Sequence, residues 1–173
     1  MTRSPRKAVL VLSLLAFCAG MPAAHAAMSI SAPASVNLGS AATGSATITH
    51  QLGTVTMTNT SVLGLVSSMT ATVTCTDFTT GGGGQYKTIF KSSFSYWSGL
   101  ATALSGISVG NVTPGQPTAL NAVSLSVSRT AFSSASLLQL GSVSVSWNPT
   151  IVVNIPASAV VGTYTGTITH SVA

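Results

Sequence analysis

Few side chains in this sequence could carry out chemistry, and Asp77 is the only side-chain carboxylate among them. A glycosidase of the usual kind needs two carboxylates that flank the scissile bond. A high-affinity calcium site needs several oxygen ligands, many of them carboxylates. One acidic residue in 173 meets neither requirement, so the sequence argues against both kinds of site.

A serine-hydrolase triad and a zinc site can each be assembled from the remaining groups. His50, His170 and Asp77 could join one of the many serines, and the same residues with Cys75 could ligate zinc. The close Cys or His pairs typical of zinc sites do not occur, and no segment resembles a nucleophile elbow. We therefore expect no catalytic residue, no bound metal and no cofactor, with a secreted hydrolase as a remote alternative.

The net charge of +5 divides unevenly along the chain. Arg3, Arg6 and Lys7 lie within the first ten residues, which leaves three cations and Asp77 in the remainder, a net charge of +2. Nucleic acids and anionic membranes are bound by clustered cations. Three scattered cations form no such cluster, so we expect no nucleic-acid partner.

The first 26 residues have the three parts of a secretory signal peptide. A basic start precedes an apolar run at residues 8–19, and Ala-His-Ala at residues 24–26 is a small-residue cleavage site. The run is shorter than the roughly 20 residues of a membrane-spanning helix, and no second run follows. We therefore expect a signal peptide at 1–26 and one secreted, extracellular domain at 27–173 that does not span the membrane.

Cys18 leaves a second interpretation of this leader open, because a lipoprotein signal also ends in a Cys. A lipidated Cys normally follows a small residue, whereas Phe17 stands here, so cleavage after Ala26 is favoured. Removal of the leader leaves Cys75 alone, which excludes an internal disulfide. The neighbours of Cys75 alternate between apolar and polar types, which predicts an inert thiol on the buried face of a strand.

Apolar and hydroxyl side chains alternate with a period of two through much of the remaining sequence. This period is typical of strands with one buried face, and no comparable stretch has helical spacing. Thr150–Ile155 is apolar on both faces in its middle and predicts a central strand. The alternating segments are Thr54–Thr58, Met69–Thr76, Ser124–Ser128, Ser142–Trp147 and Tyr164–Val172.

Turn residues separate these segments. Short strands with such breaks predict a single all-β domain, an antiparallel β-sandwich of the immunoglobulin-like or Greek-key type. Residues 98–122 and 133–140 have no clear periodicity, and the sequence leaves both stretches unassigned.

The end of the Met69–Thr76 segment has its own local chemistry. Asp77 predicts a turn in which the carboxylate accepts local backbone N–H groups, and Gly81–Gly84 predicts a flexible surface loop. Further along, the spacing of Phe90, Phe94 and Tyr96 predicts that the three rings share one face of a strand and enter the core.

Two of the alternating segments resemble the WxL domains of secreted and surface proteins of Gram-positive bacteria. In that family a Trp-x-Leu begins an alternating strand that ends in an acidic residue and Phe, the layout of Met69–Phe78 here. A second Trp-x-Leu lies after a Tyr-Thr-x-Thr strand at the C-terminus, the layout of Tyr164–Val172. Trp147–Pro149, Val153–Pro156 and Val36–Gly39 also resemble segments of the family.

The two Trp-x-Leu motifs themselves are replaced, since residues 69–71 are Met-Thr-Ala and residues 170–172 are His-Ser-Val. The resemblance implies a WxL-like fold at 27–173. It also implies noncovalent attachment to peptidoglycan or to other surface proteins, a role associated with the motifs. The positions to which it assigns binding are Met69, Ala71, His170 and Val172.

The sequence therefore predicts a non-enzymatic secreted or cell-surface protein that associates noncovalently with the cell wall or with other envelope proteins. The alternative is a structural subunit that assembles by strand addition. Strands rich in Thr and Ser lack the Lys and Pro that usually protect sheet edges, which leaves such pairing physically open.

Overall fold

Antiparallel β-strands form the framework of the protein. The structure is a computed structural model that describes residues 27–42, 46–61 and 67–173. Within these ranges every strand pairing is antiparallel, and the only helices are two short 3-10 turns. The predicted all-β fold is therefore confirmed. The expected signal peptide at 1–26 lies outside the described residues.

The elements follow one another along the chain without an α-helix in the described ranges. The strands are β1 (Ala27–Ser31), β2 (Thr47–Gln51), β3 (Val55–Ser61), β4 (Ser67–Cys75), β5 (Phe78–Thr79), β6 (Thr88–Ile89), β7 (Phe94–Trp97), β8 (Ala101–Pro114), β9 (Val123–Ser124), β10 (Arg129–Trp147), β11 (Thr150–Asn154) and β12 (Ile168–Val172). The 3-10 helices are η1 (Lys91–Ser93) and η2 (Ala119–Asn121).

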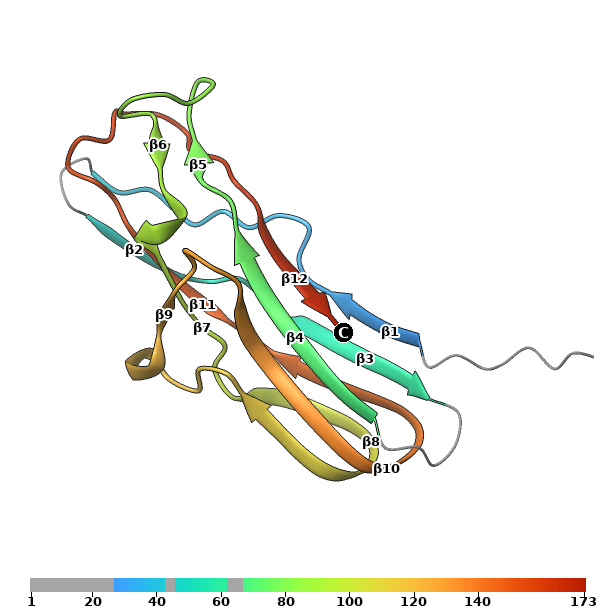
Figure 1. The fold of residues 1–173 in the computed structure, drawn as a ribbon. Helices are drawn as coiled ribbons and strands as arrows, with labels where there is room; N and C mark the ends of the chain where they lie inside the picture. Colours follow the sequence, from blue (N-terminus) through green and yellow to red (C-terminus); the bar gives the residue numbers. More distant parts are fainter. Residues whose placement is uncertain (1–26, 43–45, 62–66) are drawn as a thin grey trace, which may run out of the picture.

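The strands form a six-stranded sheet, a four-stranded sheet and a two-stranded ribbon. The first has the order β1-β3-β10-β4-β12, with β8 also paired to β10; the second has the order β2-β11-β7-β9, and β5 pairs with β6. The first two sheets meet where the Leu52 N–H donates to the Pro149 carbonyl over 2.8 Å. At this junction β2 continues into β3 and β10 into β11, so each pair of strands lies end to end (Figure 1).

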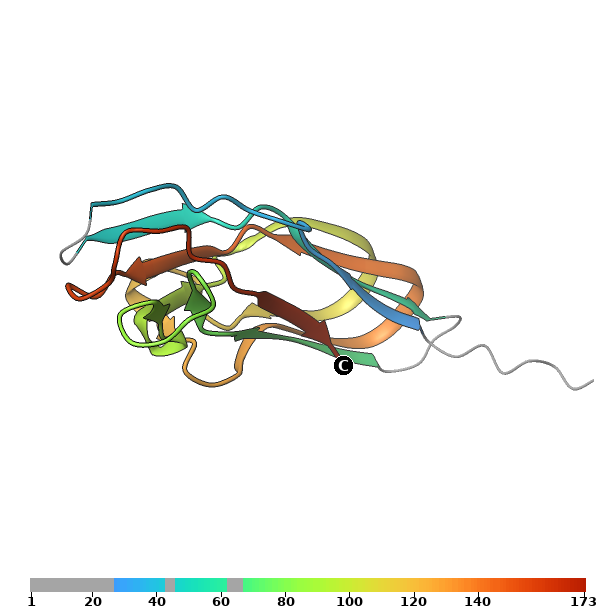
Figure 2. The same ribbon diagram turned by 90° about the horizontal axis from the view of Figure 1, so that it is seen from above.

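The long strand β10 doubles back on itself. The ring centroids of Phe132 and Trp147 lie 4.7 Å apart, although a straight strand would separate these residues by about 50 Å. The two halves of β10 also have different partners, because residues 129–136 pair with β4 and residues 141–147 pair with β3. The reversal therefore joins two layers, one with β4 and β12 and the other with β1, β2 and β3 (Figure 2).

β8 follows β10 through the same reversal. The register between the two strands shifts twice between residues 136 and 144 of β10. Gly141 of β10 has a φ of +95° and Gly106 of β8 a φ of +97°, a left-handed conformation that costs an L side chain about 1 kcal/mol. A Cβ at Gly106 would also meet the backbone carbonyl oxygen of Ser142. The close passage of the strands therefore requires glycine at position 106.

The core forms where the apolar faces of the alternating strands meet between the layers. The segment predicted at Met69–Thr76 overlaps β4 from Met69 to Cys75, and the odd-numbered residues of the segment are buried while the even-numbered ones are half-buried or exposed. The strand predicted at Thr54–Thr58 is confirmed from Val55 onward in β3, and the one at Ser142–Trp147 is confirmed within β10. Thr150–Ile155 contains the central strand β11. The largest fully buried side chains are Trp147, Tyr96, Phe94, Phe132 and Met57.

The strand predicted at Ser124–Ser128 is wrong beyond its first residue. Only Val123 and Ser124 are in a strand. The Ser126 N–H donates to the Ser124 hydroxyl over 3.2 Å, a local bond of the kind that competes with strand pairing. The chain turns there, and Val127 is 56% exposed instead of facing the core.

Two further predictions fail at the ends of strands. Phe90 does not join Phe94 and Tyr96 on the buried face, since it is 60% exposed. The helix η1 follows it directly, so Phe90 lies outside the alternation of β7. The last strand begins at Ile168 and not at Tyr164, because residues 164–167 contribute only an isolated bridge to β5.

The two stretches that the sequence leaves unassigned contain all of β8 and part of the reversal of β10. Residues 98–122 include β8, and residues 133–140 lie inside β10. Shifts of register interrupt the pairing of these two strands, and such irregularities break the period of two by which a strand is recognised in a sequence.

Replacement of the two glycines at the reversal tests the close passage of β8 and β10. Both substitutions to Ala add a Cβ at a φ near +95°, but nothing lies within 4 Å of a Cβ at Gly141. We expect Gly141→Ala to lower the free energy of unfolding by about 1 kcal/mol and Gly106→Ala by about 3 kcal/mol. Urea denaturation followed by Trp fluorescence measures both, and equal losses would contradict the close passage.

Candidate functional site

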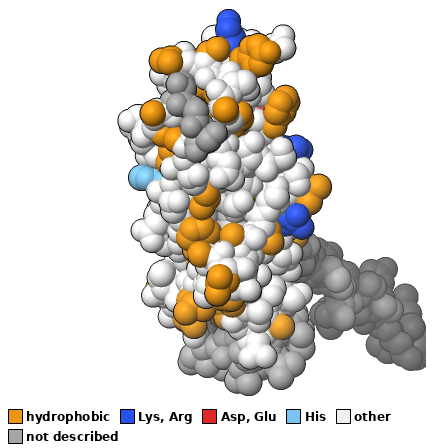
Figure 3. All heavy atoms as spheres, turned by 90° about the vertical axis from the view of Figure 1, so that its left-hand side faces the viewer, with side chains coloured by type: hydrophobic (Ala, Val, Ile, Leu, Met, Phe, Trp, Pro, Cys, Tyr) orange, Lys and Arg blue, Asp and Glu red, His pale blue; other side chains and the backbone are white. Residues whose placement is uncertain are grey.

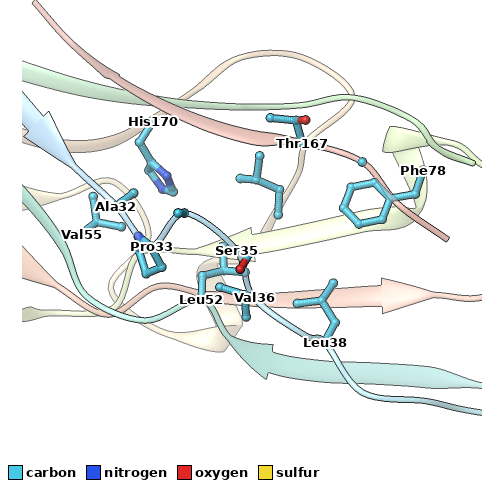
Figure 4. A pocket seen from close by; sticks show the side chains of 13 residues that line it. Ala32, Pro33, Ser35, Val36, Leu38, Leu52, Val55, Phe78, Thr167 and His170 are labelled. Atoms are coloured by element: carbon cyan, nitrogen blue, oxygen red, sulfur yellow. The ribbon is translucent and has the colours of Figure 1, made fainter. Parts of the chain in front are cut away.

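A groove lies between residues 32–38, which follow β1, and residues 166–170, which lead into β12. Its volume is about 180 Å³. Figure 4 shows Val36 on one side of this groove, with Thr167 and His170 on the other. The groove therefore lies between the two layers, beside β12. This strand carries two of the predicted binding positions, His170 and Val172.

Most of the described residues that line the groove have apolar side chains, and none of these lining residues is charged. None of the thirteen described residues that line it is Lys, Arg, Asp or Glu. Its polar side chains are those of Ser35, Thr167 and His170. On the face seen in Figure 3, too, Lys and Arg are isolated among hydrophobic and uncharged side chains. A site of this kind favours an uncharged partner with apolar surface and a few hydrogen-bonding groups.

His170 links the groove to the core. Its Nε2 lies 3.2 Å from the Tyr96 hydroxyl in a hydrogen bond. Its ring centroid lies 5.9 Å from that of Tyr96 and 6.3 Å from that of Trp147. Burial lowers the pKa of His170 to about 4 and raises the pKa of Tyr96. At neutral pH the pair is therefore an uncharged hydrogen bond between β12 and the four-stranded sheet.

The four positions assigned by the family resemblance meet in one pair of strands. Val172 lies opposite Ala71 and His170 opposite Val73 in the pairing of β12 with β4. Met69 is 3% exposed and Ala71 is fully buried, so both side chains belong to the core. Of the four, only His170 lines the groove.

Asp77 has a structural partner near the groove. Its carboxylate accepts the Lys91 N–H over 2.7 Å. The expected bond to local backbone N–H groups is therefore wrong, because this partner lies 14 residues further along the chain. The next residue, Phe78, packs on Phe94 with ring centroids 4.6 Å apart and lines the groove. A Cβ at Gly166 would meet the Phe78 ring, so glycine allows the last segment to cross this ring.

The groups considered for a triad or a zinc site lie on different elements. His50 is on β2 in the four-stranded sheet, whereas His170 is on β12 and Asp77 follows β4. Within the described ranges, no three His, Cys, Asp or Glu side chains are placed to hold a metal ion. Cys75 is 8% exposed, which confirms the predicted buried thiol. Burial, with a smaller contribution from Asp77, raises the pKa of Cys75 to about 11.

Sequence reasoning identified one side of the groove and missed the other. Residues 32–38 lie outside any strand and contribute more of the lining than β12 does. Their sequence contains Pro33 and small residues, which indicate a loop but give no sign of the element they will face. The resemblance at Val36–Gly39 was the only signal that pointed to this segment.

Comparisons with family models, with curated proteins and with solved structures found no match. Among the described residues there is no helix of the length and hydropathy needed to cross a membrane.

The buried His170 predicts a specific pH dependence of stability. Its pKa is about 4 in the folded protein and about 6.5 when exposed, so the unfolded chain binds the proton more tightly. Stability is therefore greatest above pH 6.5 and declines as the pH falls toward 4. Between pH 7 and pH 5 we expect a loss of about 2 kcal/mol. Urea denaturation at both pH values should show it, whereas His170→Phe should remove most of the decline; an unchanged decline would contradict the burial of this imidazole.

Proposed function

We propose that the protein is a non-enzymatic extracellular module that associates noncovalently with the cell wall or with other envelope proteins. The groove between residues 32–38 and β12 is the proposed binding site. Its uncharged lining and its neutral His170 supply the main support, because glycan and peptide surfaces offer hydroxyl, amide and apolar groups to such a site. Export by the leader at residues 1–26 is part of the proposal.

The proposal includes a finer description of the fold. Two antiparallel layers with a shared apolar core favour a β-sandwich of the immunoglobulin-like or Greek-key type. The WxL-like assignment is likewise a proposal, supported by the segments quoted above and by the pairing of β12 with β4, which places residues 170–172 opposite residues 71–73. A fold can persist where a binding motif has changed, so binding is proposed for the groove and not for Met69 or Ala71.

Retention on purified peptidoglycan tests the main proposal. Thr167 is exposed and lines the groove, so Thr167→Trp should fill it and reduce retention at least tenfold. Thr74 is exposed on the outer face of β4, so Thr74→Trp adds the same ring elsewhere and should leave retention unchanged. The measurement is a sedimentation assay with increasing amounts of the insoluble polymer.

Two results would count against this proposal. Retention no greater than that of an unrelated secreted β-sandwich of similar charge would eliminate peptidoglycan as the partner. Equal retention of the Thr167→Trp and Thr74→Trp proteins would eliminate the groove as the site.

A second function is favoured by the edges of the six-stranded sheet. Within the described ranges, β8 and β12 each pair with one strand only, and neither contains Lys, Arg, Asp or Glu. Unprotected edges of this kind permit assembly by strand addition, which would make the protein a structural subunit. We expect the average mass in light scattering to rise with protein concentration; a monomer mass at every concentration would contradict this function.

A further inference from the structure

Three strands of the six-stranded sheet, β1, β8 and β12, each pair with one described strand only, and they differ in what surrounds them. β12 converges on β1 toward the C-terminus, as both ribbon views show (Figures 1 and 2), and residues 32–38 flank its other end across the groove. β8 lies at the margin of the molecule on the outer side of β10 (Figure 1). The first half of β8 is therefore the edge that another strand can reach more freely.

The first half of β8 is exposed on both faces. Every residue from Thr102 to Gly106 is exposed, and Leu104 is 62% exposed. Leu104 lies directly opposite Val145 of β10, whose side chain is fully buried. Opposite residues of an antiparallel pair point to the same face of the sheet. Leu104 therefore projects from the face of the sheet that packs on the core, but β8 lies one strand beyond the edge of that core.

The backbone of this edge specifies what can cover it. An edge strand presents a row of N–H and C=O groups, and another β-strand is the partner that satisfies them in order. The edge carries no charged side chain, so an equally uncharged strand meets no repulsion. Its hydroxyl groups are already engaged with β10: Ser105 with the Ser144 hydroxyl at 2.7 Å, and Thr102 with the Ser146 carbonyl at 3.1 Å.

We propose that β8 is the assembly edge and that its partner is β8 of a second copy of this chain. Antiparallel pairing of the two strands about a twofold axis makes one surface serve both partners. Each copy then supplies an uncharged strand that pairs with the open edge of the other copy. Each Leu104 gains apolar neighbours across the new pairing. This inference rests on the second function above, assembly by strand addition, and names its edge and its partner.

A pair of charge variants separates this edge from its competitor. Leu104→Lys places an ammonium group on the β8 edge, and Thr169→Lys places the same charge on an exposed position of the β12 edge. Charged side chains, Lys above all, protect edges against pairing. In sedimentation velocity we expect wild type and Thr169→Lys to associate with rising concentration and Leu104→Lys to remain monomeric. Circular dichroism checks that both variants fold.

Hydrogen exchange at low and high wild-type concentration locates the paired strand directly. We expect amide protection to increase with concentration in residues 101–106 and not in residues 168–172. Association that persists in the Leu104→Lys protein, or new amide protection confined to residues 168–172, would overturn the role of β8. Either result would still support assembly by strand addition at another edge. A wild-type monomer at all concentrations would overturn both the edge and the structural-subunit function.

Discussion

Phe132 and Trp147 belong to the same strand, β10, yet their ring centroids lie 4.7 Å apart within the core. Only a reversal of the strand brings them together. The reversal in turn requires β8 to pass close to the backbone of β10 at Gly106, where a side chain would meet Ser142. With β10 folded in this way, its first half pairs with β4 in one layer and its second half with β3 in the other. The layers are thus joined through a continuous strand.

This arrangement positions the groove. Trp147 ends β10 beside the imidazole of His170, and Tyr96 from the four-stranded sheet reaches the same ring. The hydrogen bond between Tyr96 and His170 therefore connects β12 to the opposite layer. The burial that lowers the pKa of His170 also keeps the groove neutral, so the feature that fixes β12 in place defines the chemistry that a partner would meet.

Where one face of a strand is buried and the other is exposed to solvent, the sequence predicts the strand and its buried face well. Met69–Thr76 shows the rule most clearly, because its period of two matches the burial of β4 residue by residue. Ser124–Ser128 has the same period but forms a turn, since a Ser hydroxyl there accepts a backbone N–H and ends the pairing. Local hydrogen bonding overrides periodicity at that point.

The reversal of β10 and one wall of the groove could not be predicted in this way. Both depend on contacts between residues far apart in the chain: Gly106 with Ser142 at the reversal, and residues 32–38 with β12 at the groove. The alternation of apolar and polar side chains identifies which face of a strand is buried. It does not identify the element that packs on that face. His170 was assigned through a family motif that is replaced here, and only its burial beside Tyr96 explains its physical role.

Photo-crosslinking in secreting cells tests the central functional claim most directly, because it identifies what occupies the groove. A photoreactive side chain at Val36, which lines the groove, is compared with one at Thr74 on the exposed face of β4. We expect adducts of peptidoglycan fragments or of a defined envelope protein from position 36 and few from position 74. Adducts of equal yield and identity from both positions would contradict a binding role for the groove.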